Sequence, residues 1–157
     1  MKHRFAVALA GAAAVLVGGG ALALGAASSL PKANLTVAQT AGMRSAAPGQ
    51  VVRFTSFAVN LGPSASQLDA EARRQHGLSI TTTSCQDVSP DGPGLCEFGE
   101  LAPFQPERMV VQATITGRVE TVATLTVCAG NEGGQSDPVP VDSCSTTFVR
   151  IVAATVA

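Results

Sequence analysis

The sequence predicts an all-β fold, an antiparallel sandwich of about seven short strands. Beyond its N-terminal stretch the chain is rich in Val, Thr, Ala and Ser, and Gly and Pro interrupt these residues at short intervals. Stretches in which apolar and polar residues alternate are separated by turn residues about every 8–12 positions, which is typical of a β-sandwich. No long stretch has the period of a helix, so the alternation determines the predicted fold class.

Residues 1–27 have the features of a secretory signal. A short basic start precedes an uncharged apolar run that ends in small residues at spacing two, where cleavage is expected. The alternative is a retained anchor helix, but three consecutive glycines interrupt the run. We expect residues 1–27 to be a cleaved signal helix, residues 28–33 a short linker and residues 34–157 one domain.

Three elements are predicted in the first half of this domain. A short strand opens at residues 34–37, and the clearest strand covers residues 51–60. One face of that clear strand carries Val52, Phe54, Ser56 and Ala58, and the other carries Val51, Arg53, Thr55, Phe57 and Val59. Residues 64–76 are predicted as one or two turns of exposed helix, because Ser66 can cap it and Gly77 can end it.

The second half of the domain continues as strands. Residues 78–83 form the next strand, and a Pro/Gly-rich turn follows it. Val, Thr and Ala alternate at residues 109–116 and again at 122–128, so both are predicted strands. A polar loop is expected at residues 130–137, and a last strand at 146–156 completes the domain.

Four cysteines lie in the predicted domain: Cys85, Cys96, Cys128 and Cys144. An exported chain favours disulfides, of which four cysteines allow three connectivities. The expected pairs are the local ones, Cys85 with Cys96 and Cys128 with Cys144, each of which would add about 3 kcal/mol to stability. A zinc site is disfavoured because there is no C-x-x-C motif and His76 is the only histidine outside the leader.

Composition also argues against two classes of function. The formal net charge is −1, and there is no Trp or Tyr, so the sequence gives no support for nucleic-acid binding. For a hydrolase, His76 would be the base and Ser79 or Ser84 a nucleophile by default, without any motif that carries a mechanism. We therefore expect no enzyme activity and no cofactor.

Two binding hypotheses stay open. Asp87 and Asp91 lie in one predicted loop, and Asn131, Glu132, Asp137 and Asp142 lie in another. Such carboxylates can hold calcium, although their spacing is not that of an EF-hand and solvated loops are the simpler interpretation. Separately, the outer face of residues 51–60, with Phe57 and Val59, is either covered core or an apolar surface that docks a partner.

Three stretches in order resemble the bacterial surface-protein repeat called domain of unknown function 11. They are Pro48 to Phe54, Asn60-Leu61-Gly62-Pro63-Ser64-Ala65, and Cys96-Glu97-Phe98-Gly99-Glu100-Leu101-Ala102-Pro103. The resemblance covers roughly residues 34–156. It implies an immunoglobulin-like β-sandwich of secreted or cell-surface proteins, often repeated in tandem as a stalk or adhesive module.

The motif residues have expected structural roles, and the chain departs from the family at two places. Asn60 can bond its own backbone two residues on, and Gly99 can permit a bulge or a close backbone approach. Residues 67–76 are charged where the family has a strand, and Phe104 stands where the family has Gly. The Cys128–Cys144 pair looks like an addition to the family pattern.

The sequence therefore favours a non-catalytic, exported module of structural or adhesion type in the bacterial cell envelope or the secreted fraction. The alternative is an extracellular or periplasmic domain that binds a ligand or calcium. The expected partner is another cell-surface or envelope protein, with no nucleic acid. Membrane contact is expected only through the leader, if it is retained. The sequence leaves the oligomeric state open.

Overall fold

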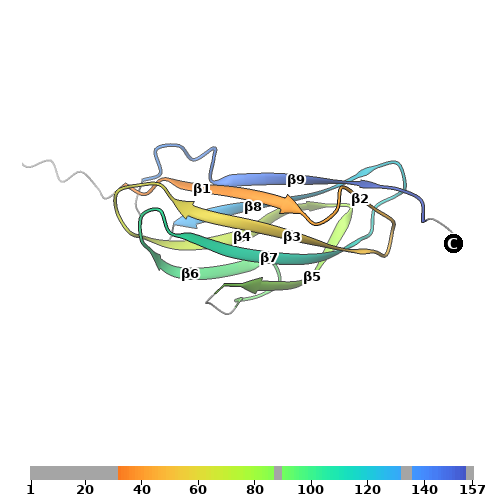
Figure 1. Ribbon diagram of the computed structural model, residues 1–157, viewed down its shortest axis with the longest axis horizontal. Helices are drawn as coiled ribbons and strands as arrows, with labels where there is room; N and C mark the ends of the chain where they lie inside the picture. Colours follow the sequence, from red (N-terminus) through yellow and green to blue (C-terminus); the bar gives the residue numbers. More distant parts are fainter. Residues whose placement is uncertain (1–31, 87–89, 132–135, 155–157) are drawn as a thin grey trace, which may run out of the picture.

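The computed structural model describes residues 32–86, 90–131 and 136–154 (Figure 1). Within these ranges the chain forms nine strands and no helix. They are β1 (Leu35–Ala41), β2 (Ser45–Ala46), β3 (Val51–Asn60), β4 (Ser66–His76), β5 (Leu78–Cys85), β6 (Leu95–Leu101), β7 (Pro106–Ile115), β8 (Val122–Asn131) and β9 (Cys144–Ile151). The predicted signal helix and most of the linker lie outside the described residues.

Two sheets pack face to face. One has the strand order β1-β3-β7-β5 and the other the order β2-β9-β8-β4-β6. All pairs are antiparallel except the short parallel pair of β2 and β9. The predicted all-β, immunoglobulin-like antiparallel sandwich is thereby confirmed. The described ranges hold no helix that could cross a membrane.

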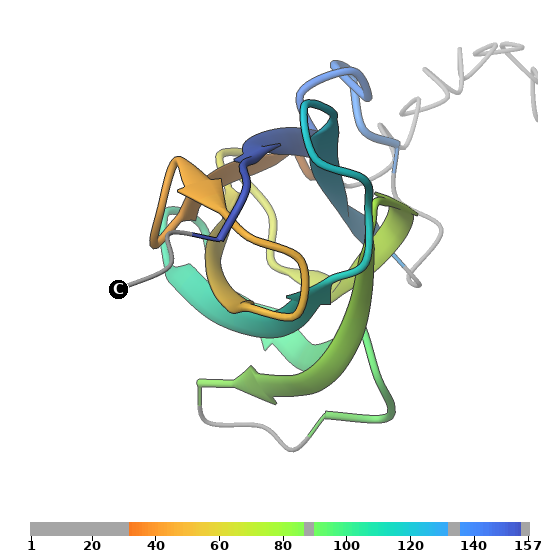
Figure 2. The ribbon, with the colours of Figure 1, turned by 90° about the vertical axis from the view of Figure 1, so that its right-hand side faces the viewer.

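The inward faces of the two sheets form one hydrophobic core, around which the strands wrap (Figure 2). The predicted alternation in β3 is confirmed, because Val52, Phe54, Ser56 and Ala58 are buried and face the second sheet. The largest fully buried apolar side chains are Phe54, Leu35, Leu101, Met109, Ile115, Leu125, Ile151, Val52, Val111, Val127 and Val149.

The two sheets meet at two corners that are held in different ways. At one corner β1 lies against the chain that leads into β9, and the N–H of Val37 donates to the carbonyl of Asp142 at 3.1 Å. At the other corner a disulfide joins β5 of one sheet to β6 of the other. The first corner is thus closed by backbone contacts and the second by a covalent bond.

The helix predicted at residues 64–76 is wrong, because residues 66–76 form strand β4. Its buried residues Ser66, Leu68 and Ala70 recur at spacing two, the period of a strand. β4 lies between β8 and β6, so residues 68–71 are paired on both sides, residues 66–67 with β6 alone and the end of the strand with β8 alone. Helix propensities differ by less than about 1 kcal/mol per residue, which is too little to outweigh two ladders of hydrogen bonds.

Three smaller differences concern strand number and ends. Residues 95–101, for which the sequence predicts no element, form β6, and β2 is a two-residue strand, so the described residues hold nine strands rather than about seven. β8 extends to Asn131, which shortens the predicted loop, and β9 ends at Ile151 rather than near residue 156.

Asn60 has the structural role that the sequence predicts. Its side chain is fully buried, and its Oδ1 accepts from the N–H of Gly62 at 2.9 Å, two residues on. Its Nδ2 donates to the carbonyl of Ser64 at 2.7 Å. A Cβ at Gly62 would lie 2.5 Å from the carbonyl oxygen of Lys32, so a close backbone approach requires glycine there. This motif fastens the turn after β3 to the start of β1.

The two other motif positions are explained by backbone conformation. Gly99 has a φ of 71° and lies beside the register shift between Leu68 and Asp69, so the expected bulge is confirmed. Phe104 has a φ of 63°, a left-handed conformation that costs a non-glycine residue about 1–2 kcal/mol. Its N–H donates to the carbonyl of Asn60 at 2.7 Å, which keeps the turn in the form that glycine would adopt.

Candidate functional site

The structure places the four cysteines at bonding distance in the two expected pairs. Cys85 and Cys96 have an S–S distance of 1.98 Å and join the two sheets, and Cys96 is fully buried. Cys128 and Cys144 have an S–S distance of 2.04 Å and lie directly opposite each other on neighbouring strands of one sheet. The described residues contain no free cysteine.

The outer face of β4, β8 and β9 is the most distinctive surface of the described residues. We name it the arginine face, and it comprises Arg73, Arg74, Thr126, Thr146, Phe148 and Arg150. Strand pairing brings it together, since Arg74 lies opposite Thr126 and Thr126 lies opposite Thr146. The two threonine hydroxyls share a hydrogen bond of 2.8 Å.

A bulge in β4 explains why two consecutive arginines share this face. The register of β4 against β8 shifts between Ala72 and Arg74, which leaves Arg73 as the extra residue. Successive side chains of a regular strand point to opposite faces, but a bulge re-aims one of them. Arg73 and Arg74 consequently line the same depression of about 340 Å³, together with Cys128 and Cys144.

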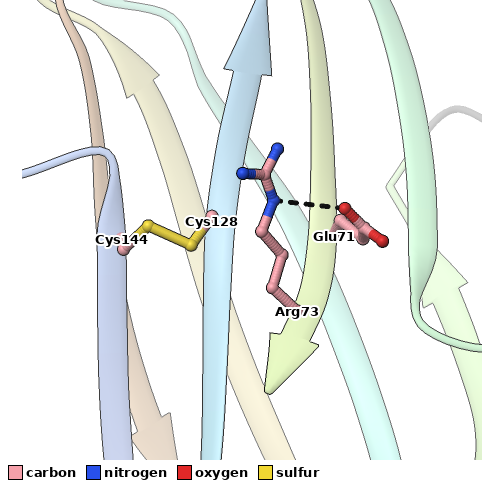
Figure 3. A network of polar contacts seen from close by, with 4 residues as sticks. All are labelled: Glu71, Arg73, Cys128 and Cys144. Atoms are coloured by element: carbon pink, nitrogen blue, oxygen red, sulfur yellow. Dashed lines mark hydrogen bonds and ion pairs between the residues drawn. A yellow bond between two sulfur atoms is a disulfide. The ribbon is translucent and has the colours of Figure 1, made fainter. Parts of the chain in front are cut away.

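Arg73 lies between the disulfide and an acidic side chain in Figure 3. Its Nε donates to Oε2 of Glu71 at 3.2 Å, and both side chains are about half exposed. No other ion pair occurs among the described residues, so Arg74 and Arg150 have no carboxylate partner within them. The arginine face therefore presents one neutralised and two unneutralised guanidinium groups.

The calcium hypothesis finds little support in the described part of the two loops. Asp137 accepts hydrogen bonds from the N–H of Leu35, the N–H of Val139 and the hydroxyl of Ser143, so its carboxylate fastens the loop to β1. Asp87 and Glu132 lie outside the described residues. Among the described side chains, no three His, Cys, Asp or Glu residues gather as metal ligands would.

Another acidic pair was not predicted from the sequence. Asp69 of β4 and Glu97 of β6 lie directly opposite each other and line a depression of about 50 Å³ with Gly99. The bulge at Gly99 sets this register. A Cβ at Gly130 would collide with the Asp69 carboxylate in its present position, so a larger residue there would displace that side chain. Like charges placed opposite each other weaken a strand pair unless other groups compensate them.

The default catalytic residues are not assembled into a site. His76 ends β4 in one sheet, whereas Ser79 and Ser84 lie on β5 in the other sheet. All three are exposed, and no hydrogen bond links them in the part of the chain that the structure describes. A nucleophile and a base of this kind would need to lie within hydrogen-bond reach.

The outer face of β3 is uncovered, which answers the question left open by the sequence. Val51 is 50% exposed and Phe57 is 41% exposed, while Val59 is intermediate. The second sheet packs on the opposite face of β3, and Phe57 has only Ala38 and Arg108 as its cross-strand neighbours. Arg53 and Thr55 separate Val51 from Phe57 along this face, whereas Phe57 and Val59 are next to each other on it.

Sequence reasoning missed the arginine face for two reasons. Its residues come from positions 73, 74, 126, 146, 148 and 150, which only the order β9-β8-β4 brings together. The helix predicted over residues 64–76 also removed Arg74 from any strand face. The pair Arg73-Arg74 within a stretch of alternating buried residues was the one available signal, because two successive outward residues indicate a bulge.

Models of known protein families include none that matches this chain, and no curated protein matches it. Among solved structures, the chain is similar to the solution NMR structure of the CARDB domain of PF1109 from Pyrococcus furiosus. The TM-score is 0.55 at 14% identity, over 80% of this chain and 100% of that one.

A crystal structure of the same Pyrococcus domain, in complex with di-metal ions, gives a TM-score of 0.51 at 12% identity. That match covers 79% of this chain and 92% of the other. At such low identities the two likenesses show the fold alone, an immunoglobulin-like β-sandwich module.

Proposed function

We propose that the chain is a non-catalytic, exported module with a structural or adhesive role in the bacterial cell envelope or the secreted fraction. The observation that carries this proposal is the pair of disulfides built into a small domain behind a leader of secretory type. Disulfides persist in oxidising compartments outside the cytoplasm. The resemblance to domain of unknown function 11 supports the same location and stays a prediction.

The shape of the domain supports a role in series with other segments. The described chain begins at one end of the long axis and ends at the other (Figure 1). A module of this shape can add its full length to a stalk, because its two ends point in opposite directions. The covalent link between the sheets adds resistance to separation of the two layers.

The scattered positions of His76, Ser79 and Ser84 support the non-catalytic part of the proposal.

The alternative is a calcium-binding domain, which is favoured by one observation, the di-metal complex of the structurally similar Pyrococcus domain. Equilibrium dialysis against calcium separates the two, because the structural module is expected to retain none and to melt at the same temperature with and without calcium.

The experiment that tests the proposal is an intact-mass measurement of the protein secreted by a bacterial host, before and after reduction. We expect a chain that starts near Ser28 and whose mass is lower than that of its reduced form by about four hydrogens, one pair for each bond. Peptide mapping should give the Cys85–Cys96 and Cys128–Cys144 links. Free thiols would contradict the proposed export, and an intact N-terminus would mean that the leader is retained as a membrane anchor rather than cleaved.

A further inference from the structure

The arginine face concentrates positive charge in a chain whose formal net charge is −1. Arg73 and Arg74 from β4 and Arg150 from β9 lie on it, all of them exposed. The bulge in β4 is the feature that puts Arg73 beside Arg74 rather than toward the core. Glu71 is the carboxylate that forms an ion pair with these arginines among the described residues, and the acidic pair of Asp69 and Glu97 lies further along the same sheet face.

The chemistry of the face extends beyond its charge. Arg74 lines the depression of about 340 Å³ with the hydroxyls of Thr126 and Thr146. Phe148 is 64% exposed, and it lies on β9 between Thr146 and Arg150, with its ring on the same outer face. Guanidinium groups bind carboxylates in a bidentate manner, hydroxyls bind sugar hydroxyls, and an aromatic face covers apolar sugar surface.

The separation of the two unneutralised arginines indicates a polymer rather than a small anion. Arg74 pairs with Thr126 and Arg150 with Val122, so they lie four residues apart along β8. At about 3.4 Å per residue and 4.8 Å per strand, the two positions are roughly 17 Å apart. A chain with repeated negative charges can contact both guanidinium groups, whereas a single small anion could do so only if both side chains extended fully toward each other.

We propose that the arginine face binds an acidic polysaccharide, with carboxylates at Arg74 and Arg150 and a sugar ring against Phe148. The choice of a polysaccharide rests on the proposed extracellular function, since such polymers occur outside the cytoplasm. A nucleic acid fits less well, because the face has one aromatic side chain rather than a series of stacking platforms. A membrane fits less well because the face is a flat sheet with hydroxyls rather than an apolar wedge.

The test is isothermal titration calorimetry of the purified, oxidised protein with hexagalacturonate, an oligomer that carries one carboxylate per sugar. We expect binding that weakens as salt is added, because exposed charges are screened. The variant Arg74→Ala/Arg150→Ala should bind at least about tenfold more weakly, which corresponds to about 1.4 kcal/mol. Arg73→Ala should have a smaller effect, since Glu71 already neutralises that side chain.

Matched controls make the outcome decisive. Arg53→Ala removes another exposed arginine, from the outer face of β3, and should leave binding unchanged. Neutral maltohexaose should not bind. The inference is overturned if hexagalacturonate does not bind, if Arg53→Ala weakens binding as much as the double variant, or if maltohexaose binds equally well. It is also overturned if only DNA or phosphatidylglycerol vesicles bind through these arginines.

A negative result in the binding experiment can be distinguished from a negative result in the export experiment. Calorimetry uses purified protein, so absence of binding would overturn this inference and leave the proposed exported module standing. Free thiols in the secreted chain would overturn the proposed function, while a measured role of Arg74 and Arg150 in binding hexagalacturonate would remain. Because the exchanged side chains are exposed, far-UV circular dichroism is expected to show the same fold for every variant.

Discussion

The two disulfides close loops of similar length but connect very different parts of the molecule. Cys85–Cys96 spans 11 residues and joins β5 of one sheet to β6 of the other, where Cys96 is fully buried. Cys128–Cys144 spans 16 residues and joins β8 to β9, which are already paired by a ladder of backbone hydrogen bonds. The first bond holds two layers together, and the second duplicates a contact within one layer.

The difference teaches that loop length alone does not rank these bonds. In the chain-entropy model each bond contributes about 3 kcal/mol, and the longer loop contributes slightly more. Contacts in the folded state favour the opposite ranking, in which Cys85–Cys96 contributes more to stability than Cys128–Cys144. Replacement of Cys96 empties a site in the core, whereas Cys144 lies on the exposed side of its sheet.

The largest expected effect is that of removing the bond between the sheets. The variant Cys85→Ala/Cys96→Ala should lower the free energy of unfolding by about 4 kcal/mol, of which about 3 come from chain entropy and about 1 from lost packing at Cys96. The variant Cys128→Ala/Cys144→Ala should lower it by about 3 kcal/mol or less.

Equilibrium unfolding in urea measures both values under the same oxidising conditions. The opposite order, with the Cys128–Cys144 variant less stable, would mean that loop length decides the ranking and that the inter-sheet position adds nothing. Equal slopes against urea are required for the comparison, because a changed slope indicates a changed unfolded state.

The sheet framework was predictable because it depends on local alternation. The faces of residues 51–60 followed from period two alone, and Asn60 and Gly62 followed from turn chemistry. β4 was not predictable in the same way. Its Ala, Glu and Arg residues favour helix weakly, and its strand form depends on pairing with β6 and β8, which are distant in sequence.

The candidate site was less predictable than the fold. The cysteine pairs could be predicted by joining the cysteines that are closest in sequence. The sequence could not show that one of the two bonds connects the two sheets. Arg74 and Arg150 are separated by 76 positions, and their common face depends on strand order and on a bulge at Arg73. The residues that share one surface of the domain can therefore be identified only after the strand order is known.

A second prediction sharpens the comparison through chemical access. Mild treatment of the folded protein with glutathione should reduce Cys128–Cys144 before Cys85–Cys96, because a thiolate must reach a sulfur atom. Cys128 and Cys96 are both buried, at 5% and 0% exposure, but their partners differ, since Cys144 is exposed whereas Cys85 is only partly exposed. Each reduction transfers two electrons from two glutathione thiols. Timed alkylation followed by peptide mass spectrometry measures both rates, and simultaneous reduction would show that the domain unfolds before either bond reacts.

The smallest expected effect concerns the ion pair beside the exposed bond. Glu71→Gln should change the free energy of unfolding by less than about 0.5 kcal/mol, since both members of the pair are half exposed. It leaves the Arg73 guanidinium unneutralised next to Cys128 and Cys144. A positive charge stabilises both the approaching glutathione thiolate and the thiolate that leaves, and a unit charge at contact in water is worth at most about 1 kcal/mol.

Reduction of Cys128–Cys144 should therefore be about threefold faster in Glu71→Gln, while that of Cys85–Cys96 stays the same. Glu100→Gln is the matched control, because it removes an exposed carboxylate from β6 without touching the ion pair. An equal acceleration in the control would assign the effect to net charge. An unchanged rate in Glu71→Gln would mean that steric access to the exposed bond, rather than the charge beside it, sets how fast it opens.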